Sequence, residues 1–402
     1  MLRDERFEID PSEDAELGVA RGGRLEFWVS HEEEVRGILL LVGGQGANED
    51  LCALHALRKW AASRFKIAAV SVFYHGFDCR FSEDEAHHPR LDADSVENLR
   101  KGLARIGIKA DELNEKNYLA FLDFYNQALG YMGLGSKKEL EFTLIPPNGD
   151  YQNHGILAAL DCLNALKAVR KKFAQAGGGG GRLPSIFYGS FYGGHLALLC
   201  AKIAPQAVDC VIETAGEALP VLERILAKDL ERHEFVIEYE KVRLNCHTYG
   251  LWSRREGAKH YFSDDAYLVR AILNAEHLKI QHAANPHTIF VSLGAREDGG
   301  FKDKQTLHLA MQELGFRARL EAYAGEGDAE ILERELPPML EALSSFFSIS
   351  PAAQNPAQNP DGQNSTATNP ADGSAEICYP CRDKIYRFRD TEAGLVCEIF
   401  SK

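Results

Sequence analysis

Residues 184–205 read PSIFYGSFYGGHLALLCAKIAP. The stretch begins with a short apolar run, continues into a glycine-rich turn of the form G-x-x-x-G-G at residues 189–194, and ends in an apolar segment with helical periodicity. We therefore expect a buried strand, a sharp turn and a buried helix, in that order. The flanking sequence indicates the kind of sheet to which this strand belongs.

Short apolar runs alternate with helical segments on both sides of this unit. Residues 37–42 (GILLLV) and 67–73 (IAAVSVF) are continuously apolar, as strands buried on both faces are, and residues 287–293 (HTIFVSL) form a later run of this kind. Helical periodicity separates the runs, most clearly over residues 155–173. The alternation predicts an α/β fold with a mostly parallel central sheet of about eight strands covered by helices.

Two stretches interrupt the alternation, and the end of the chain departs from it. Residues 79–147 and 217–285 contain no long buried run, and we expect both to be helical insertions in a main domain of residues 1–348. Residues 349–376 are rich in Ala, Asn, Gln and Pro, which is typical of a disordered linker. Residues 377–402 then form a short tail that contains Cys378, Cys381 and Cys397.

The cysteines of the tail allow two kinds of interpretation. The first two could be a redox pair or half of a zinc site, but a structural zinc ion needs four ligands and only one further cysteine lies nearby. The simpler interpretation is a tail with incidental thiols. The nine cysteines of the whole chain are scattered, which favours reduced thiols over a disulfide framework. We predict no metal site and no cofactor.

The composition argues against several classes of partner. Lys and Arg total 45 against 59 Asp and Glu, so the formal charge of −14 repels nucleic-acid phosphates and anionic lipids. No stretch approaches the roughly 18 apolar residues of a membrane span, and the start MLRDERFEID is charged where a signal peptide is apolar. We expect a cytoplasmic protein whose partner is a small molecule, an acyl or sugar ligand, and neither nucleic acid nor a membrane.

A strand, a glycine-rich sharp turn and a helix near mid-chain are the setting of the nucleophile elbow in α/β-hydrolases. The nucleophile of such an elbow has a strained backbone, so the residues two before and two after it must be small. Gly189 and Gly193 satisfy this rule and place Phe191 at the nucleophile position. Phenylalanine has no nucleophilic atom, so this frame predicts a site that has lost its nucleophile.

Ser190 is the alternative nucleophile. Its frame puts Tyr188 and Tyr192 at the two positions that must be small, so it fits the steric rule poorly. The triad of this fold runs nucleophile, acid, histidine along the chain, yet no histidine follows His308. Asp328 stands in the loop where the histidine is expected, and a carboxylate with an ordinary pKa of about 3.9 is a weak base at neutral pH.

Further residues are expected at the carboxyl edge of the sheet, where α/β folds bind ligands. Asp298, in the loop after residues 287–293, fits the position of the triad acid. The turn at residues 43–46 could bind an oxyanion through its backbone N–H groups or could be only a tight turn. His75 ends a central strand and could line the pocket, whereas His195 is more simply structural. The candidate residues that line the pocket are Gly43, Gly44, Gln45, His75, Phe191, Tyr192 and His195.

Several segments carry a resemblance to a known family: DYQN at 150–153 followed by GIL at 155–157, LALLCAKIAP at 196–205, VI at 211–212 and LNAEHLK at 273–279. Over roughly residues 20–348 the chain resembles an uncharacterised bacterial family with an α/β-hydrolase-like domain, often encoded among flagellin-glycosylation genes. Members typically have G-S-S-[HY]-G-G at the elbow and a late histidine-glycine pair. This chain reads GSFYGG at 189–194 and lacks the late histidine.

We therefore expect a catalytically degenerate α/β-hydrolase-fold protein that keeps a pocket at the elbow. The resemblance implies a binding or accessory role in flagellin or surface-glycan modification. The alternative is an active serine ester hydrolase or acyltransferase that uses Ser190, with a base such as His75 or His195 supplied from elsewhere in the fold.

Overall fold

The computed structural model describes all residues except 134–135, 177–181, 227, 296–299, 324 and 350–374. Its centre is an eight-stranded sheet with the order β1-β2-β4-β3-β7-β8-β11-β12. β2 is antiparallel to both of its neighbours, and all other neighbouring pairs are parallel. The predicted mostly parallel sheet is thus confirmed. Its strands are β1 (Arg3–Ile9), β2 (Leu25–His31), β3 (Ile38–Val42), β4 (Ala68–Phe73), β7 (Ser185–Ser190), β8 (Cys210–Thr214), β11 (Ile289–Gly294) and β12 (Arg317–Ala322).

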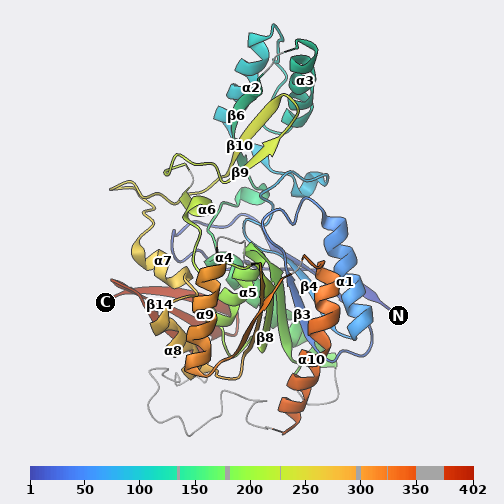
Figure 1. Ribbon diagram of the computed structural model, residues 1–402, viewed down its shortest axis with the longest axis vertical. Coiled ribbons are helices and arrows are strands. Elements are labelled where there is room, and N and C mark those ends of the chain that lie inside the picture. The colour runs from blue at the N-terminus through green and yellow to red at the C-terminus, as the bar shows by residue number, and fades with distance from the viewer. Residues whose placement is uncertain (134–135, 177–181, 227, 296–299, 324, 350–374) are drawn as a thin grey trace.

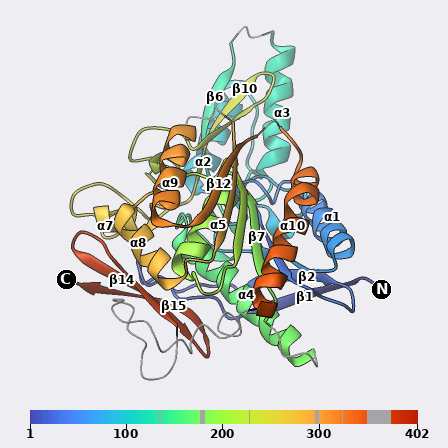
Figure 2. The same cartoon turned by 60° about the horizontal axis from the view of Figure 1, so that its bottom comes forward.

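Helices cover both faces of this sheet (Figures 1 and 2). Successive residues of β3 belong to different cores: Leu39 and Leu41 pack in one apolar cluster, and Leu40 and Val42 in the other. This alternation explains why the run is apolar at every position. The helices α1 (Leu51–Phe65) and α10 (Asp328–Ile349) cover one face, and α4 (Ile156–Ala176), α5 (Tyr192–Ile203), α8 (Ala275–Ala284) and α9 (Phe301–Leu314) cover the other.

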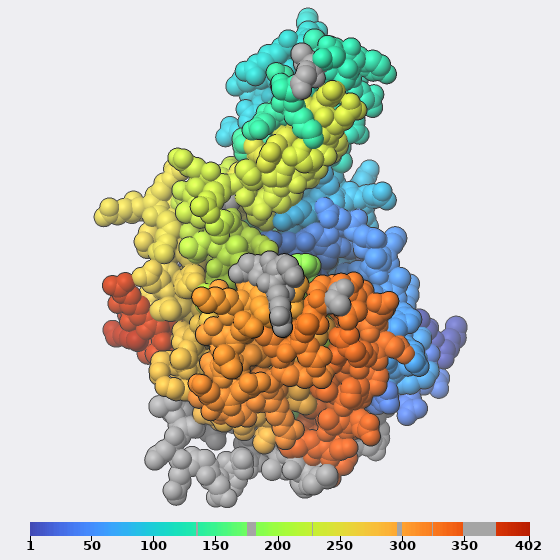
Figure 3. Space-filling view, in the orientation of Figure 1, coloured from blue at the N-terminus to red at the C-terminus, as the bar shows by residue number. Residues whose placement is uncertain are grey.

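The two insertions meet in a separate lobe above the carboxyl edge of the sheet (Figures 1 and 3). They share a four-stranded sheet, in which β6 of the first insertion pairs in parallel with β10 of the second. The insertions, which we predicted to be helical, therefore contribute strands as well as helices. The elements between residues 79 and 149 and between 222 and 270 are η1 (Glu85–His87), β5 (Arg90–Leu91), α2 (Ala93–Arg105), α3 (Tyr118–Tyr131), β6 (Lys138–Ile145), η2 (Pro147–Gly149), α6 (Leu222–Leu226), β9 (Phe235–Glu238), β10 (Val242–Thr248) and α7 (Asp264–Arg270). Of these, α7 lies beside α8 and outside the lobe (Figure 1).

The end of the chain forms a three-stranded antiparallel sheet of β13 (Glu376–Pro380), β14 (Lys384–Thr391) and β15 (Gly394–Ser401). This small sheet packs on α4 and α8, and Tyr379 and Phe388 enter the main core. The Tyr379 hydroxyl donates a hydrogen bond of 2.5 Å to the carbonyl of Lys202 in α5. About 26 residues would not fold alone, but these acquire a core by docking. The predicted linker at 349–376 lies largely outside the described residues.

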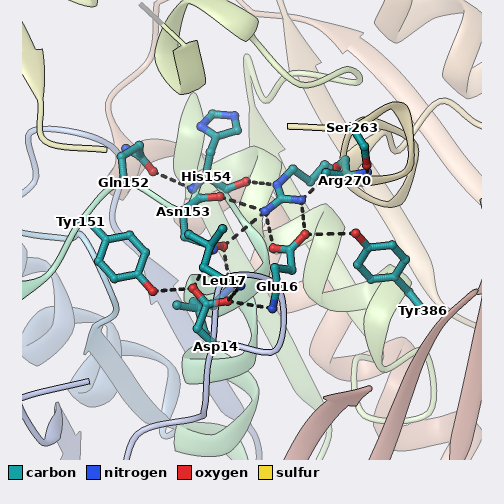
Figure 4. A network of polar contacts seen from close by, with 12 residues as sticks. Asp14, Glu16, Leu17, Tyr151, Gln152, Asn153, His154, Ser263, Arg270 and Tyr386 are labelled. Atoms are coloured by element: carbon teal, nitrogen blue, oxygen red, sulfur yellow. Dashed lines mark hydrogen bonds and ion pairs between the residues drawn. The ribbon is translucent and has the colours of Figure 1, made fainter. Parts of the chain in front are cut away.

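A buried polar network ties the N-terminal segment to α7 and to the C-terminal sheet (Figure 4). Arg270 and Glu16 form an ion pair of 2.5 Å whose side chains are 0% and 2% exposed. The guanidinium also donates to the carbonyl of His154 at 2.8 Å, and the Tyr386 hydroxyl donates to Glu16 at 3.3 Å. Because both charges are withdrawn from water, each depends on the other for stabilisation.

Within the described part of the chain no helix is both long and apolar enough to cross a bilayer. The same part contains no group of three or more His, Cys, Asp or Glu side chains arranged to hold a metal ion. Cys381 is buried, Cys378 and Cys397 are partly buried, and all three are free thiols.

Candidate functional site

The turn after β7 has the backbone geometry of a nucleophile elbow, and Phe191 lies at its tip. Phe191 has φ 50° and ψ −116°, a conformation that L-residues rarely adopt. Its backbone N–H donates to the carbonyl of Thr214 at 2.7 Å, and α5 begins at the next residue. Ser190 is the last residue of β7 and does not lie at the tip. The strained position is therefore kept, although the side chain there cannot attack a substrate.

Gly189 and Gly193 are required because the ends of β7 and β3 and the start of α5 approach one another closely. A Cβ atom at Gly189 would lie 2.4 Å from the carbonyl of Gly193, and one at Gly193 would lie 2.2 Å from the carbonyl oxygen of Val42. No side chain fits at such distances. The start of α5 is thereby held directly against the ends of β7 and β3, which brings the turn at residues 43–46 beside the elbow.

Phe191 presents its ring to solvent. The side chain is among the exposed large apolar residues of the described chain, at 59% relative exposure. Tyr192, the residue that follows it, is buried and packs edge-on against Tyr74 with ring centroids 6.3 Å apart. The tip of the elbow is thus apolar and accessible, in the place where a hydrolase of this fold holds its nucleophile.

Ser190 and Tyr188 both donate hydrogen bonds to Asp328, the first residue of α10. The distances to its Oδ1 are 3.1 Å from the Ser190 hydroxyl and 2.5 Å from the Tyr188 hydroxyl. Burial and the neighbouring Asp328 carboxylate raise the pKa of Tyr188, so its hydroxyl remains a donor. Asp328 thus follows β12, the position at which this fold places its catalytic histidine. Its carboxylate accepts hydrogen bonds from the Ser190 and Tyr188 hydroxyls.

The two histidines considered as substitute bases are both buried, and each lies close to a partner other than Ser190. His75 is 4% exposed, and its Nδ1 lies 3.0 Å from Oδ1 of Asp150. His195 is 1% exposed and donates from Nδ1 to the carbonyl of Glu217 at 2.8 Å. Burial lowers the pKa of His195, which keeps the ring neutral. Among the described residues no histidine forms a hydrogen bond with Ser190, whose hydroxyl bonds to Asp328.

A pocket of about 470 Å³ lies beside the elbow, between the first turn of α1 and the ends of β3 and β7. Its lining combines an apolar wall, a glycine-rich floor and several polar side chains. The lining residues are Leu41, Val42, Gly43, Gly44, Gly46, Ala47, Glu49, Asp50, Ala53, Leu54, Leu57, Tyr188, Gly189, Ser190 and Asp328.

The pocket contains part of the predicted site. Gly43, Gly44 and Ser190 line it. Gln45, His75, Phe191, Tyr192 and His195 are not among its lining residues, although all five lie at the carboxyl edge of the sheet or on α5. Asp298 lies outside the described residues, so its role as the acid stays a prediction.

Sequence reasoning missed Glu49 and Asp50 as lining residues. Both precede α1, and the Asp50 side chain caps that helix by accepting from the N–H of Ala53 at 2.8 Å. A carboxylate directly before an expected helix was a visible signal of the cap. It was not a signal of a pocket, because the pocket exists only where α1 meets β7 and α10.

The strand order with an antiparallel second strand, together with an elbow after the fifth strand of the main sheet, defines an α/β-hydrolase-fold protein. The chain belongs to the family described as a protein of unknown function, DUF2920, whose model matches residues 5–331. The C-terminal sheet lies beyond the matched residues.

Solved structures of esterases are similar to this chain at low identity. The esterase Est22 is 12% identical, with a TM-score of 0.42 over 88% of this chain and 79% of that chain. The hyperthermophilic esterase from the archaeon Pyrobaculum calidifontis is 13% identical, with a TM-score of 0.40 over 89% and 87%. Carboxyl esterase 2 from Tuber melanosporum is 9% identical, with a TM-score of 0.39 over 87% of each chain. No curated protein matches the chain.

Proposed function

We propose that this protein is a catalytically degenerate α/β-hydrolase-fold protein that binds a small molecule in the pocket beside the elbow. The observation that carries the proposal is Phe191 at the tip of an elbow whose backbone geometry is otherwise retained. A phenyl ring cannot form the covalent intermediate of the hydrolase mechanism. Asp328 stands where this fold places its histidine, so the general base is replaced by a carboxylate as well.

The remaining features support binding of a ligand with a carbonyl or hydroxyl oxygen. Tyr192 opens α5, and the first N–H groups of a helix have no partner inside it. Hydrolases of this fold use the N–H after the nucleophile, with one from the loop after the third strand, to hold an oxyanion. Here the corresponding turn packs on the elbow, since a Cβ at Gly44 would lie 3.1 Å from the carbonyl oxygen of Ser190. An acyl or sugar ligand meets this description.

The biological setting in this proposal is flagellin or surface-glycan modification in the cytoplasm. It rests on the sequence resemblance described above. In that setting the protein acts as a binding or accessory protein for an enzyme that carries out the chemistry.

A second candidate function is an active ester hydrolase or acyltransferase that uses Ser190. One observation favours it: the Ser190 hydroxyl lies in the pocket and is hydrogen-bonded to a carboxylate. Asp328 would then have to act as the general base. A carboxylate is poorly matched to that task near neutral pH, because an efficient base has a pKa close to the working pH.

The substitution Phe191→Ser separates loss of the nucleophile from loss of the base. It restores a hydroxyl at the strained tip, but we expect p-nitrophenyl acetate hydrolysis to stay at the level of a Phe191→Ala control, because Asp328 and not a histidine follows β12 in the described chain. The measurement is turnover by purified variants whose circular dichroism matches that of the parent protein. Clear turnover in Phe191→Ser alone would show that a working base is present and would contradict the proposal.

A further inference from the structure

A buried polar cluster lies between the main sheet and α9, inside an otherwise apolar layer. Its members are Glu213 of β8, Ser292 of β11, and Lys304 and His308 of α9, and none of them is more than 3% exposed. Polar groups withdrawn from water are stable only where they are hydrogen-bonded. The partners of each of these side chains therefore have to be accounted for.

The two strands present their polar side chains to the same helix. Ser292 is paired in register with Glu213 on the neighbouring strand. Two positions earlier, Val211 and Phe290 pack in the apolar cluster that contains Leu307 of α9. Because side chains alternate between the faces of a strand, Glu213 and Ser292 also lie on the face that α9 covers.

The helix supplies the other two members of the cluster. Lys304 and His308 are four residues apart and so lie on one face of α9. The Lys304 ammonium donates to Oε2 of Glu213 at 2.7 Å, and the side chains of this ion pair are 4% and 0% exposed. The same oxygen accepts from the backbone N–H of Gly216 at 2.8 Å. Oε2 therefore has two donors, and the charge of Glu213 is balanced by that of Lys304.

Hydrogen-bonding capacity remains at the other three groups of the cluster. Within the part of the chain that the structure describes, Oε1 of Glu213, Oγ of Ser292 and both ring nitrogens of His308 are buried without a hydrogen-bond partner. Burial lowers the pKa of His308 to about 4, so the ring is neutral and has one donor and one acceptor nitrogen. The cluster thus combines unused donors with unused acceptors and carries no net charge.

We infer that the buried polar cluster is a binding site for internal water between β8, β11 and α9. Water both donates and accepts hydrogen bonds, as this mixture of groups requires, and waters in protein interiors typically bond to about three polar groups. A cation would lie beside the Lys304 ammonium and an anion beside the Glu213 carboxylate, so the balanced charge favours a neutral ligand. The inference goes beyond the proposed function and does not depend on the pocket beside the elbow.

A crystal structure of the full chain, at a resolution that shows ordered water, tests the inference. We expect a water within about 2.5–3.2 Å of Glu213 Oε1 and of either the Ser292 hydroxyl or a His308 ring nitrogen. The variant Ser292→Val removes the hydroxyl and places a methyl group beside Glu213. We expect it to lose this water and to lower the midpoint of thermal unfolding by about 2–4 °C, because polar atoms are then stranded.

Thr306→Val is the matched control, because Thr306 is an exposed residue of the same helix whose hydroxyl bonds to the carbonyl of Lys302. It should shift the midpoint by less than about 1 °C. Direct hydrogen bonds from Ser292 or His308 to Glu213 Oε1, with no water density, would show that the cluster is complete without a ligand. Density with the coordination distances of an ion would overturn the class of ligand. Equal stability of Ser292→Val and Thr306→Val would show that no bound water stabilises these groups and would also overturn the inference.

Discussion

The substitution Gly193→Ala is expected to lower the free energy of unfolding by at least about 3 kcal/mol. A Cβ atom there would lie 2.2 Å from the carbonyl oxygen of Val42, and the contact is with backbone that cannot rotate away. Overpacking a core commonly costs about 1–3 kcal/mol, and a clash with fixed backbone belongs at or above the upper end. The start of α5 would have to move away from β3, which would disrupt the elbow itself.

Urea denaturation followed by circular dichroism measures this effect. Gly250→Ala provides the control, because a Cβ at Gly250 would meet its nearest neighbour at an ordinary 3.8 Å. We expect that control to change stability by less than about 0.5 kcal/mol, as surface substitutions usually do. Equal stability of the two variants would show that the three backbone segments do not approach as closely as described.

The substitution Arg270→Met is expected to lower the free energy of unfolding by about 3–5 kcal/mol, because it leaves the Glu16 carboxylate buried without its counter-ion. Both side chains of the pair are almost fully buried, at 0% and 2% exposure. The guanidinium also donates to the carbonyl of Ala266 at 2.9 Å, so a helical carbonyl loses a partner too. The N-terminal segment, α7 and the C-terminal sheet should loosen together, since this network joins them (Figure 4).

Two variants control this experiment. Arg232→Met removes an arginine whose pair with Glu223 is 65% and 42% exposed, and we expect it to be nearly neutral. The double variant Glu16→Gln/Arg270→Met should lose less stability than the sum of its two single substitutions, because no charge is then stranded. Additive losses in the double variant would mean that the two side chains do not stabilise each other.

The elbow could be predicted from sequence because its determinants are local. The spacing of Gly189 and Gly193 alone places Phe191 at the tip, since the steric rule depends on residues within the turn. The order of apolar runs likewise predicts the sheet, because strands buried on both faces are apolar at every position. Asp328 could be placed in the histidine loop by the order of elements alone.

The remaining features depend on contacts between distant segments. β6 reads KELEFTLI, and three of its first five residues are charged and exposed, so it does not look like a buried strand. It becomes one by pairing with β10, about 100 residues later in the chain. The hydrogen bond between Tyr188 and Asp328 spans 140 residues. The C-terminal sheet packs on α4 and α8, and its own sequence does not indicate these two helices as its partners.

Labelling with a fluorophosphonate probe tests the central claim of a degenerate site most directly. The probe reacts with the activated serine of a working hydrolase, so a matched active esterase serves as the positive control. We predict that the folded protein shows no labelling above that of a Ser190→Ala variant, because Phe191 occupies the nucleophile position and no described histidine bonds to Ser190. Strong labelling that disappears in Ser190→Ala would contradict the account and establish an active serine hydrolase.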